Sequence, residues 1–132
     1  MSKPSVFISS TQRDAELAQR FEAALKDAGV DASNPAREAV QGKDWRKSIR
    51  TAIRGADAVV MLALAPQNLS SSWMSYEAGI AEALGKRIML LMSNRNSVAE
   101  LPADFAATQV VQFDPQAPES AARDIAFRLG VV

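Results

Sequence analysis

The sequence of 132 residues contains no cysteine and no histidine. Without cysteine, the chain has no disulfide framework, no thiolate nucleophile and no cysteine-based metal site. Without histidine, it has no Ser-His triad, no histidine-ligated zinc and no imidazole acid or base. Any catalysis must therefore depend on carboxylates, hydroxyls, Lys, Arg, Tyr or backbone groups.

An excess of charge of one sign is also missing, because 15 Lys and Arg residues balance 15 Asp and Glu residues. Nucleic-acid binders and polybasic membrane anchors depend on a cationic surface, so this balance argues against both kinds of partner. The longest strongly apolar stretch, residues 56–66, contains Asp57 and is too short to span a bilayer. The N-terminus has no apolar signal-peptide region, so we expect a cytoplasmic protein.

The hydrophobic pattern predicts strands that alternate with helices along a single domain, residues 1–132. Strands are expected at residues 5–9, 30–33 (weakly marked), 58–64, 87–92 and 109–113, and helices at 14–28, 45–55, 72–84, 98–107 and 119–129. Asp14 is expected to cap the first of these helices. The alternation predicts an α/β fold: a flavodoxin-like, doubly wound, five-stranded parallel sheet of order 2-1-3-4-5, with helices on both faces.

In such sheets, ligands bind beyond the carboxyl ends of the strands, where the strand order reverses. Here that point lies between the first and third strands, and the helix expected at residues 72–84 begins beside it. Trp73, Glu77, Ile80 and Leu84 recur at helical spacing on one stripe of this helix, with Tyr76 beside them.

Glu77 has two interpretations. It is either a glutamate at the edge of the stripe, solvated or paired with an arginine, or a carboxylate held beside an aromatic side chain at the ligand site. Ser9, Ser10 and Thr11 follow the first strand, where their hydroxyls could cradle a phosphate. However, this segment lacks the glycines of phosphate-binding loops, and such hydroxyls also form turns and helix caps.

Several segments resemble, in order and spacing, the bacterial Toll/interleukin receptor (TIR) domain family. These are Val6-Phe7-Ile8-Ser9-Ser10, Asp14, Gly42-Lys43-Asp44-Trp45, Ala56-Asp57-Ala58-Val59-Val60, Ser70-Ser71-Ser72-Trp73-Met74-Ser75-Tyr76-Glu77 and Gly85-Lys86-Arg87-Ile88. The segment that ends at Glu77 looks like the S-x-W-x-x-x-E box of the family. The resemblance covers roughly residues 5–115.

The resemblance implies a flavodoxin-like fold, a mobile loop over residues 34–44 and self-association with other TIR domains. It also implies cleavage of the nicotinamide–ribose bond of NAD, with Glu77 as the catalytic residue, in bacterial anti-phage defence or signalling. NAD is then a substrate, and no other cofactor and no metal is expected. The substrate-binding residues would be Ser9, Ser10, Thr11, Lys43, Trp45, Trp73 and Tyr76. Ser10, Thr11 and Gln12 depart from the aromatic and basic residues that the family often has there.

A single carboxylate suits this reaction, because nicotinamide is a cationic leaving group that departs neutral and needs no acid. Only the positive charge that develops on the ribose requires stabilisation, which one ionised glutamate can supply. The sequence leaves hydrolysis and cyclisation open. It also leaves open a non-catalytic TIR interaction module, acting as adaptor or effector, and a nucleotide-binding flavodoxin-like domain outside this family.

Overall fold

The computed structural model of the chain describes residues 3–34, 45–64, 72–93 and 109–131. Its elements are, in order, β1 (Ser5–Ser10), a 3-10 helix η1 (Gln12–Asp14), α1 (Ala15–Asp27), β2 (Asp31–Ser33), α2 (Trp45–Gly55), β3 (Ala58–Ala63), α3 (Ser72–Ala83), β4 (Arg87–Ser93), β5 (Gln109–Phe113) and α4 (Pro118–Arg128). The helix predicted at residues 98–107 lies outside the described residues. Of the described helices, none is long and apolar enough to cross a bilayer.

The strands form one parallel sheet of order β2-β1-β3-β4-β5, as predicted. The weakly marked second strand is only three residues long, and it pairs with β1 from Ser5 to Phe7. β1 continues to Ser10, one residue further than predicted. Ser9 and Ser10 therefore belong to the strand, where they pair with β3, and not to the turn that follows it.

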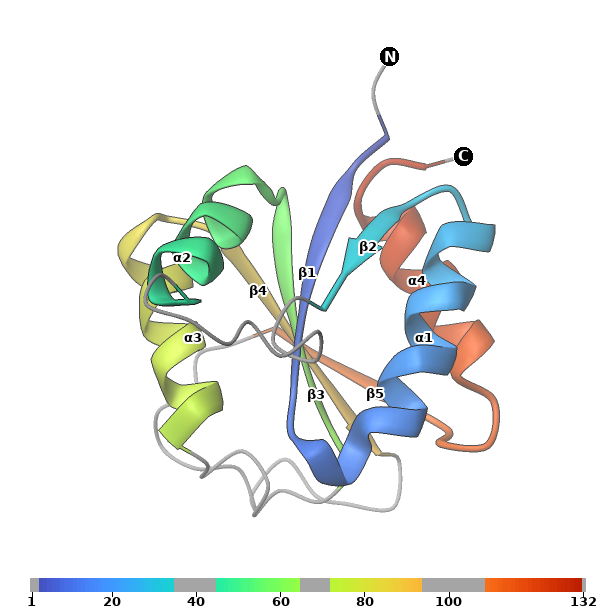
Figure 1. The fold of residues 1–132 in the computed structure, drawn as a ribbon. Helices are drawn as coiled ribbons and strands as arrows, with labels where there is room; N and C mark the ends of the chain where they lie inside the picture. The colour runs from blue at the N-terminus through green and yellow to red at the C-terminus, as the bar shows by residue number, and fades with distance from the viewer. Residues whose placement is uncertain (1–2, 35–44, 65–71, 94–108, 132) are drawn as a thin grey trace.

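Helices cover both faces of the sheet, with α1 and α4 on one face and α2 and α3 on the other (Figure 1). Val6 and Ile8 of β1 pack in the core under α1 and α4, whereas Phe7 packs in the core under α2 and α3. Because side chains alternate along a strand, Ser9 continues the side of Phe7 and Ser10 the side of Ile8. The two hydroxyls therefore leave β1 on opposite faces.

Two of the helices are followed by a glycine with a positive φ. Gly29 after α1 has φ 91° and Gly85 after α3 has φ 67°, a left-handed conformation that glycine adopts without steric cost. At the start of α1 the prediction was wrong, because Asp14 occupies the N-cap position but its side chain makes no capping hydrogen bond. Asp14 is instead buried, and its Oδ2 accepts a hydrogen bond of 3.4 Å from Thr11 Oγ1.

Candidate active site

Glu77 lies in the second turn of α3, and its side chain is completely buried, with 0% exposed. Its Oε1 accepts a hydrogen bond of 2.5 Å from Ser9 Oγ. Ser9 is the penultimate residue of β1, so the carboxylate lies at the carboxyl end of that strand. The interpretation of Glu77 as a solvated or arginine-paired residue at the edge of the stripe was therefore wrong.

The two oxygens of the Glu77 carboxylate have different surroundings. Oε1 is bonded to Ser9, whereas Oε2 is buried and has no hydrogen-bond partner among the described residues. Burial raises the pKa of Glu77 from 4.5 to about 7, and the hydrogen bond from Ser9 opposes part of this rise because it favours the ionised form. Near neutral pH the side chain thus exists both as a carboxylate and as a carboxylic acid.

The buried face of α3 explains why a carboxylate is found in this position. Met74, Glu77 and Ala81, at spacings of three and four residues, are all completely buried, whereas Ile80 and Leu84 are only half-buried. The completely buried residues therefore follow a line that is displaced around the helix from the predicted stripe and shares only Glu77 with it. Met74 and Ala81 belong to the apolar core under α2 and α3, so Glu77 interrupts an otherwise apolar face.

Ser10 also makes a buried polar contact, on the opposite face of the sheet. Its Oγ accepts a hydrogen bond of 3.1 Å from Nδ2 of Asn34, and Asn34 is only 3% exposed. The Oδ1 atom of Asn34 is buried without a partner in the part of the chain that the structure describes. The sequence analysis missed Asn34, although a polar residue directly after a strand that neighbours β1 was a usable signal.

The remaining predicted substrate-binding residues are less completely described. Thr11 forms a turn, in which its carbonyl accepts a hydrogen bond of 3.1 Å from the backbone N–H of Asp14. Tyr76 is half-buried against the core under α2 and α3. Trp45 and Trp73 are the first residue of α2 and the second residue of α3, and Lys43 lies outside the described residues.

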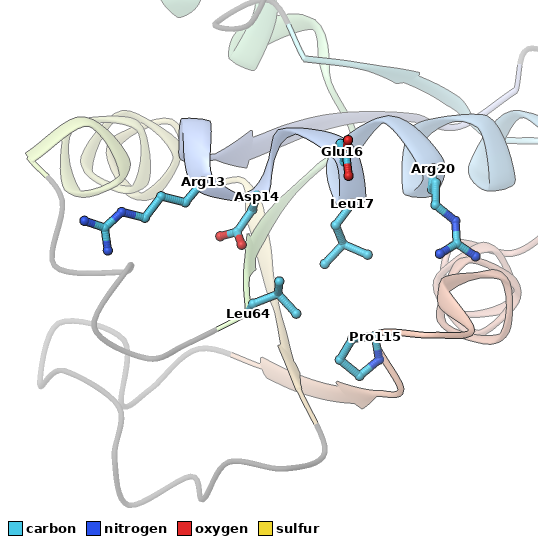
Figure 2. Close-up of a pocket in the computed structure, with 7 residues that line it drawn as sticks. All are labelled: Arg13, Asp14, Glu16, Leu17, Arg20, Leu64 and Pro115. Atoms are coloured by element: carbon cyan, nitrogen blue, oxygen red, sulfur yellow. The ribbon is translucent and has the colours of Figure 1, made fainter.

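A cavity of about 220 Å³ lies near the start of α1 (Figure 2). It is lined by Arg13, Asp14, Glu16, Leu17, Arg20, Leu64 and Pro115. Figure 2 shows Leu17, Leu64 and Pro115 directed into the cavity and Arg13 directed away from it. Neither Glu77 nor Ser9 contributes to this lining, so the cavity and the buried carboxylate are separate features.

Solved structures with the same fold are similar to this chain at low sequence identity. A CMP N-glycosidase of Clostridium botulinum has a TM-score of 0.61 and 16% identity, with 93% of this chain and 98% of that chain covered. A 2-deoxyribosyltransferase of Bacillus psychrosaccharolyticus has a TM-score of 0.66 and 16% identity, with coverages of 87% and 90%. A TIR-STING receptor of C. gigas, in complex with 2′,3′-cGAMP, has a TM-score of 0.72 and 16% identity, with coverages of 92% and 38%.

A comparison with curated protein sequences gives no match. The sequence profile of the TIR domain, in contrast, matches residues 6–126, nearly the whole chain. The match includes β1 with Ser9 and Ser10, Asn34, and α3 with Glu77. The chain therefore belongs to the TIR domain family.

Proposed function

We propose that this TIR domain is an NAD hydrolase or cyclase that cleaves the nicotinamide–ribose bond, with Glu77 as its catalytic carboxylate. The observation that carries the proposal is the position of Glu77: completely buried, at the carboxyl end of β1, with one oxygen bonded to Ser9 and the other without a partner among the described residues. Carboxylates with a strongly shifted pKa are concentrated at functional sites.

The proposed reaction needs few groups. The bond between ribose C1′ and the nicotinamide nitrogen breaks, and its electron pair stays on nicotinamide, which leaves uncharged. The ionised Glu77 stabilises the positive charge left on the ribose, or bonds to C1′ for a short time. In hydrolysis, the oxygen of a water molecule then bonds to C1′, and the proton that this water loses passes to the carboxylate or to solvent.

The role of Ser9 in this proposal is to hold and tune the carboxylate. Its hydroxyl donates to Oε1, which fixes the side chain and lowers the pKa of Glu77 relative to burial alone. A larger fraction of Glu77 is then ionised at neutral pH, and ionisation is what the stabilisation of a ribose cation requires. Ser9 is thus a positioning residue for the catalytic one.

Fold-level similarity supports the class of reaction. Two solved structures with this fold are an N-glycosidase that acts on CMP and a 2-deoxyribosyltransferase used in nucleoside synthesis. Both concern the bond between a sugar and a base, and the resemblance to bacterial TIR domains narrows the proposed substrate to NAD. At 16% identity this support is an analogy of fold.

The test is chromatography of the products after incubation of NAD with the wild type, Glu77→Gln and Glu82→Gln. Glu82 lies on the same helix and is exposed, so its variant is a matched control. Nicotinamide release is expected from the wild type and Glu82→Gln, and not from Glu77→Gln. Release that survives in Glu77→Gln would contradict the proposal. Because the family resemblance implies self-association, the assay should also be run at high protein concentration and with a crowding agent.

The alternative within the family is a non-catalytic interaction module, an adaptor or effector that binds other TIR domains. It predicts no turnover at any concentration, together with complexes seen by light scattering that substitutions in residues 37–43 disrupt. The other alternative, a nucleotide-binding domain outside this family, is excluded by the match over residues 6–126.

A further inference from the structure

Two consecutive serines at the end of β1 bind two buried polar side chains on opposite faces of the sheet. Ser9 donates to Glu77, which comes from α3, and Ser10 accepts from Asn34, which directly follows β2. The serines are consecutive at the end of β1, so both contacts lie at the carboxyl end of this strand. The proposed function uses only the Glu77 side of this arrangement.

Both buried side chains keep one polar atom without a partner among the described residues. These atoms are Oε2 of Glu77 and Oδ1 of Asn34. For Asn34, one of the two amide atoms lacks a partner whichever way the amide is oriented. If the amide were rotated, the Ser10 hydroxyl would donate to Oδ1, and the nitrogen would lose its partner instead. One amide atom therefore has no partner among the described residues in either orientation.

Unpaired buried polar atoms are rare in folded proteins, because each one loses its hydrogen bonds to water without replacement. Ile8 of β1 and Ala32 of β2, which lie two residues before Ser10 and Asn34, are both buried in the apolar core under α1 and α4, so the Ser10–Asn34 pair is a polar contact that follows apolar positions. An amide atom without a partner among the described residues, at the carboxyl end of the strand next to β1, is suited to contact a ligand that lies across the strand ends.

We propose that Asn34 is a second substrate-contacting residue, whose side-chain carbonyl accepts a hydrogen bond from an amine or hydroxyl group of the nucleotide cleaved at Glu77. This inference rests on the proposed function. In the orientation that the structure has, the amide nitrogen is bonded to Ser10, which leaves the carbonyl without a partner among the described residues and makes the ligand the donor. β1 and β2 are parallel neighbours, so the strand ends that carry Ser9, Ser10 and Asn34 point to the same side of the molecule, where a ligand of this sheet class binds across the strand ends.

NAD carries suitable donors at both ends, namely the carboxamide amine of nicotinamide and the amine and hydroxyls of adenosine. Two substrate analogues distinguish them. Nicotinamide mononucleotide lacks the adenosine, and nicotinic acid adenine dinucleotide lacks the carboxamide amine. Substitution of Asn34 should have no effect on cleavage of the analogue that lacks the group it contacts.

The experiment measures kcat and KM for NAD and both analogues with the wild type, Asn34→Ala and Asn34→Asp. Ser33→Ala is the matched control, because Ser33 is the preceding residue and is exposed. Asn34→Ala should raise the KM for NAD about tenfold with little change in kcat, since one hydrogen bond to the substrate is lost. Asn34→Asp keeps an acceptor that Ser10 can support, and its KM should stay within about threefold of the wild type.

A KM for NAD that is unchanged in a folded Asn34→Ala protein would overturn the inference. If the wild type releases no nicotinamide, the proposed function fails, and Asn34 is tested by binding alone. Calorimetric titration of NAD and ADP-ribose into the wild type and Asn34→Ala then shows whether Asn34 contacts the ligand. Affinity about tenfold lower in Asn34→Ala supports the contact, and equal affinity, or binding of neither ligand to the wild type, overturns it.

Discussion

Two serine–carboxylate pairs occupy opposite ends of the same sheet. At the amino end, Asp57 Oδ2 accepts hydrogen bonds from the backbone N–H of Ser5 at 2.7 Å and from its hydroxyl at 3.4 Å, and this pair is exposed. At the carboxyl end, Glu77 accepts from Ser9 and is completely buried. The residue types are alike and both serines belong to β1, so the two pairs differ in burial because of the groups that surround them.

The comparison shows what distinguishes a structural carboxylate from a candidate catalytic one. Asp57 joins the start of β1 to the segment before β3, with water available to its remaining lone pairs. Glu77 is completely buried, its Oε2 has no hydrogen-bond partner among the described residues, and burial raises its pKa to about 7. Burial of a carboxylate costs free energy of folding, so buried carboxylates are concentrated at functional sites, where the charge takes part in binding or catalysis.

The largest expected effect is on catalysis. Glu77→Gln should lower the rate of nicotinamide release by about 10²–10³-fold, because the charge that stabilises the ribose cation is removed. Asp57→Asn removes a carboxylate of the same class from the other end of the sheet, and the rate should stay within about twofold of the wild type, since surface substitutions have small effects. Parallel rate assays on the two variants check this. Equal losses of rate in the two variants would mean that the position of Glu77 at the carboxyl end of the sheet is not important for the reaction.

The next effect is on stability as a function of pH. The folded pKa of Glu77, about 7, lies above its ordinary value of 4.5, so between these values the folded protein holds a proton that the unfolded chain releases. The contribution of this group to stability is therefore fully present below pH 4.5 and is lost as the pH rises through 7, by at most about 3 kcal/mol.

Glu77→Gln should remove this dependence and be more stable than the wild type at pH 8. Chemical denaturation of both proteins at pH 5 and pH 8 measures the difference, with Asp57→Asn expected to follow the wild type. A Glu77→Gln protein that loses stability between pH 5 and pH 8 as steeply as the wild type would show that Glu77 is not the source.

A smaller effect concerns the pH profile of activity. In the wild type, kcat/KM should rise with pH and level off above about pH 7, as Glu77 ionises. Ser9→Ala removes the hydrogen bond that lowers this pKa, so the rising limb should move to higher pH and activity at pH 7 should fall. A rising limb of kcat/KM at the same pH in Ser9→Ala and the wild type would show that Ser9 does not lower the pKa of Glu77. Ser5→Ala, at the other end of β1, is the control and should leave the profile unchanged.

The smallest effect is expected at the exposed pair. Asp57→Asn should change the free energy of unfolding by less than about 1 kcal/mol, because exposed polar pairs in water contribute little. Denaturant titration at one pH measures this value. A cost above about 2 kcal/mol would show that the amino-end pair is structurally more important than its exposure indicates.

Local patterns predicted the elements of the fold well. The fifth strand was predicted at the observed residues 109–113, the fourth strand is one residue longer than predicted, and the last helix begins and ends one residue earlier than predicted. Met89, Met92 and Phe113, which lie in the predicted fourth and fifth strands, are buried in the core. These features depend on residues close together in the chain, where hydrophobic periodicity carries the information.

Features that depend on contacts between distant residues were predicted less well. Of the described side chains in the predicted stripe of Trp73, Glu77, Ile80 and Leu84, only Glu77 is completely buried, because packing on the sheet decides the rotation of a helix about its axis. Asn34 was missed because its partner, Ser10, is 24 residues away and meets it only through the pairing of β1 with β2. Asp14 was assigned to a cap that its side chain does not form.

The sequence by itself determined which residue types are present to form an active site: because cysteine and histidine are absent, a carboxylate was the main candidate. It also determined the alternation of strands and helices and the membership of the TIR family. Only the tertiary structure decided that Glu77 is buried and bonded to Ser9 while Asp57 is exposed and bonded to Ser5. The physical reason is that burial and pKa depend on which distant groups exclude water from a side chain, and the fold alone brings those groups together.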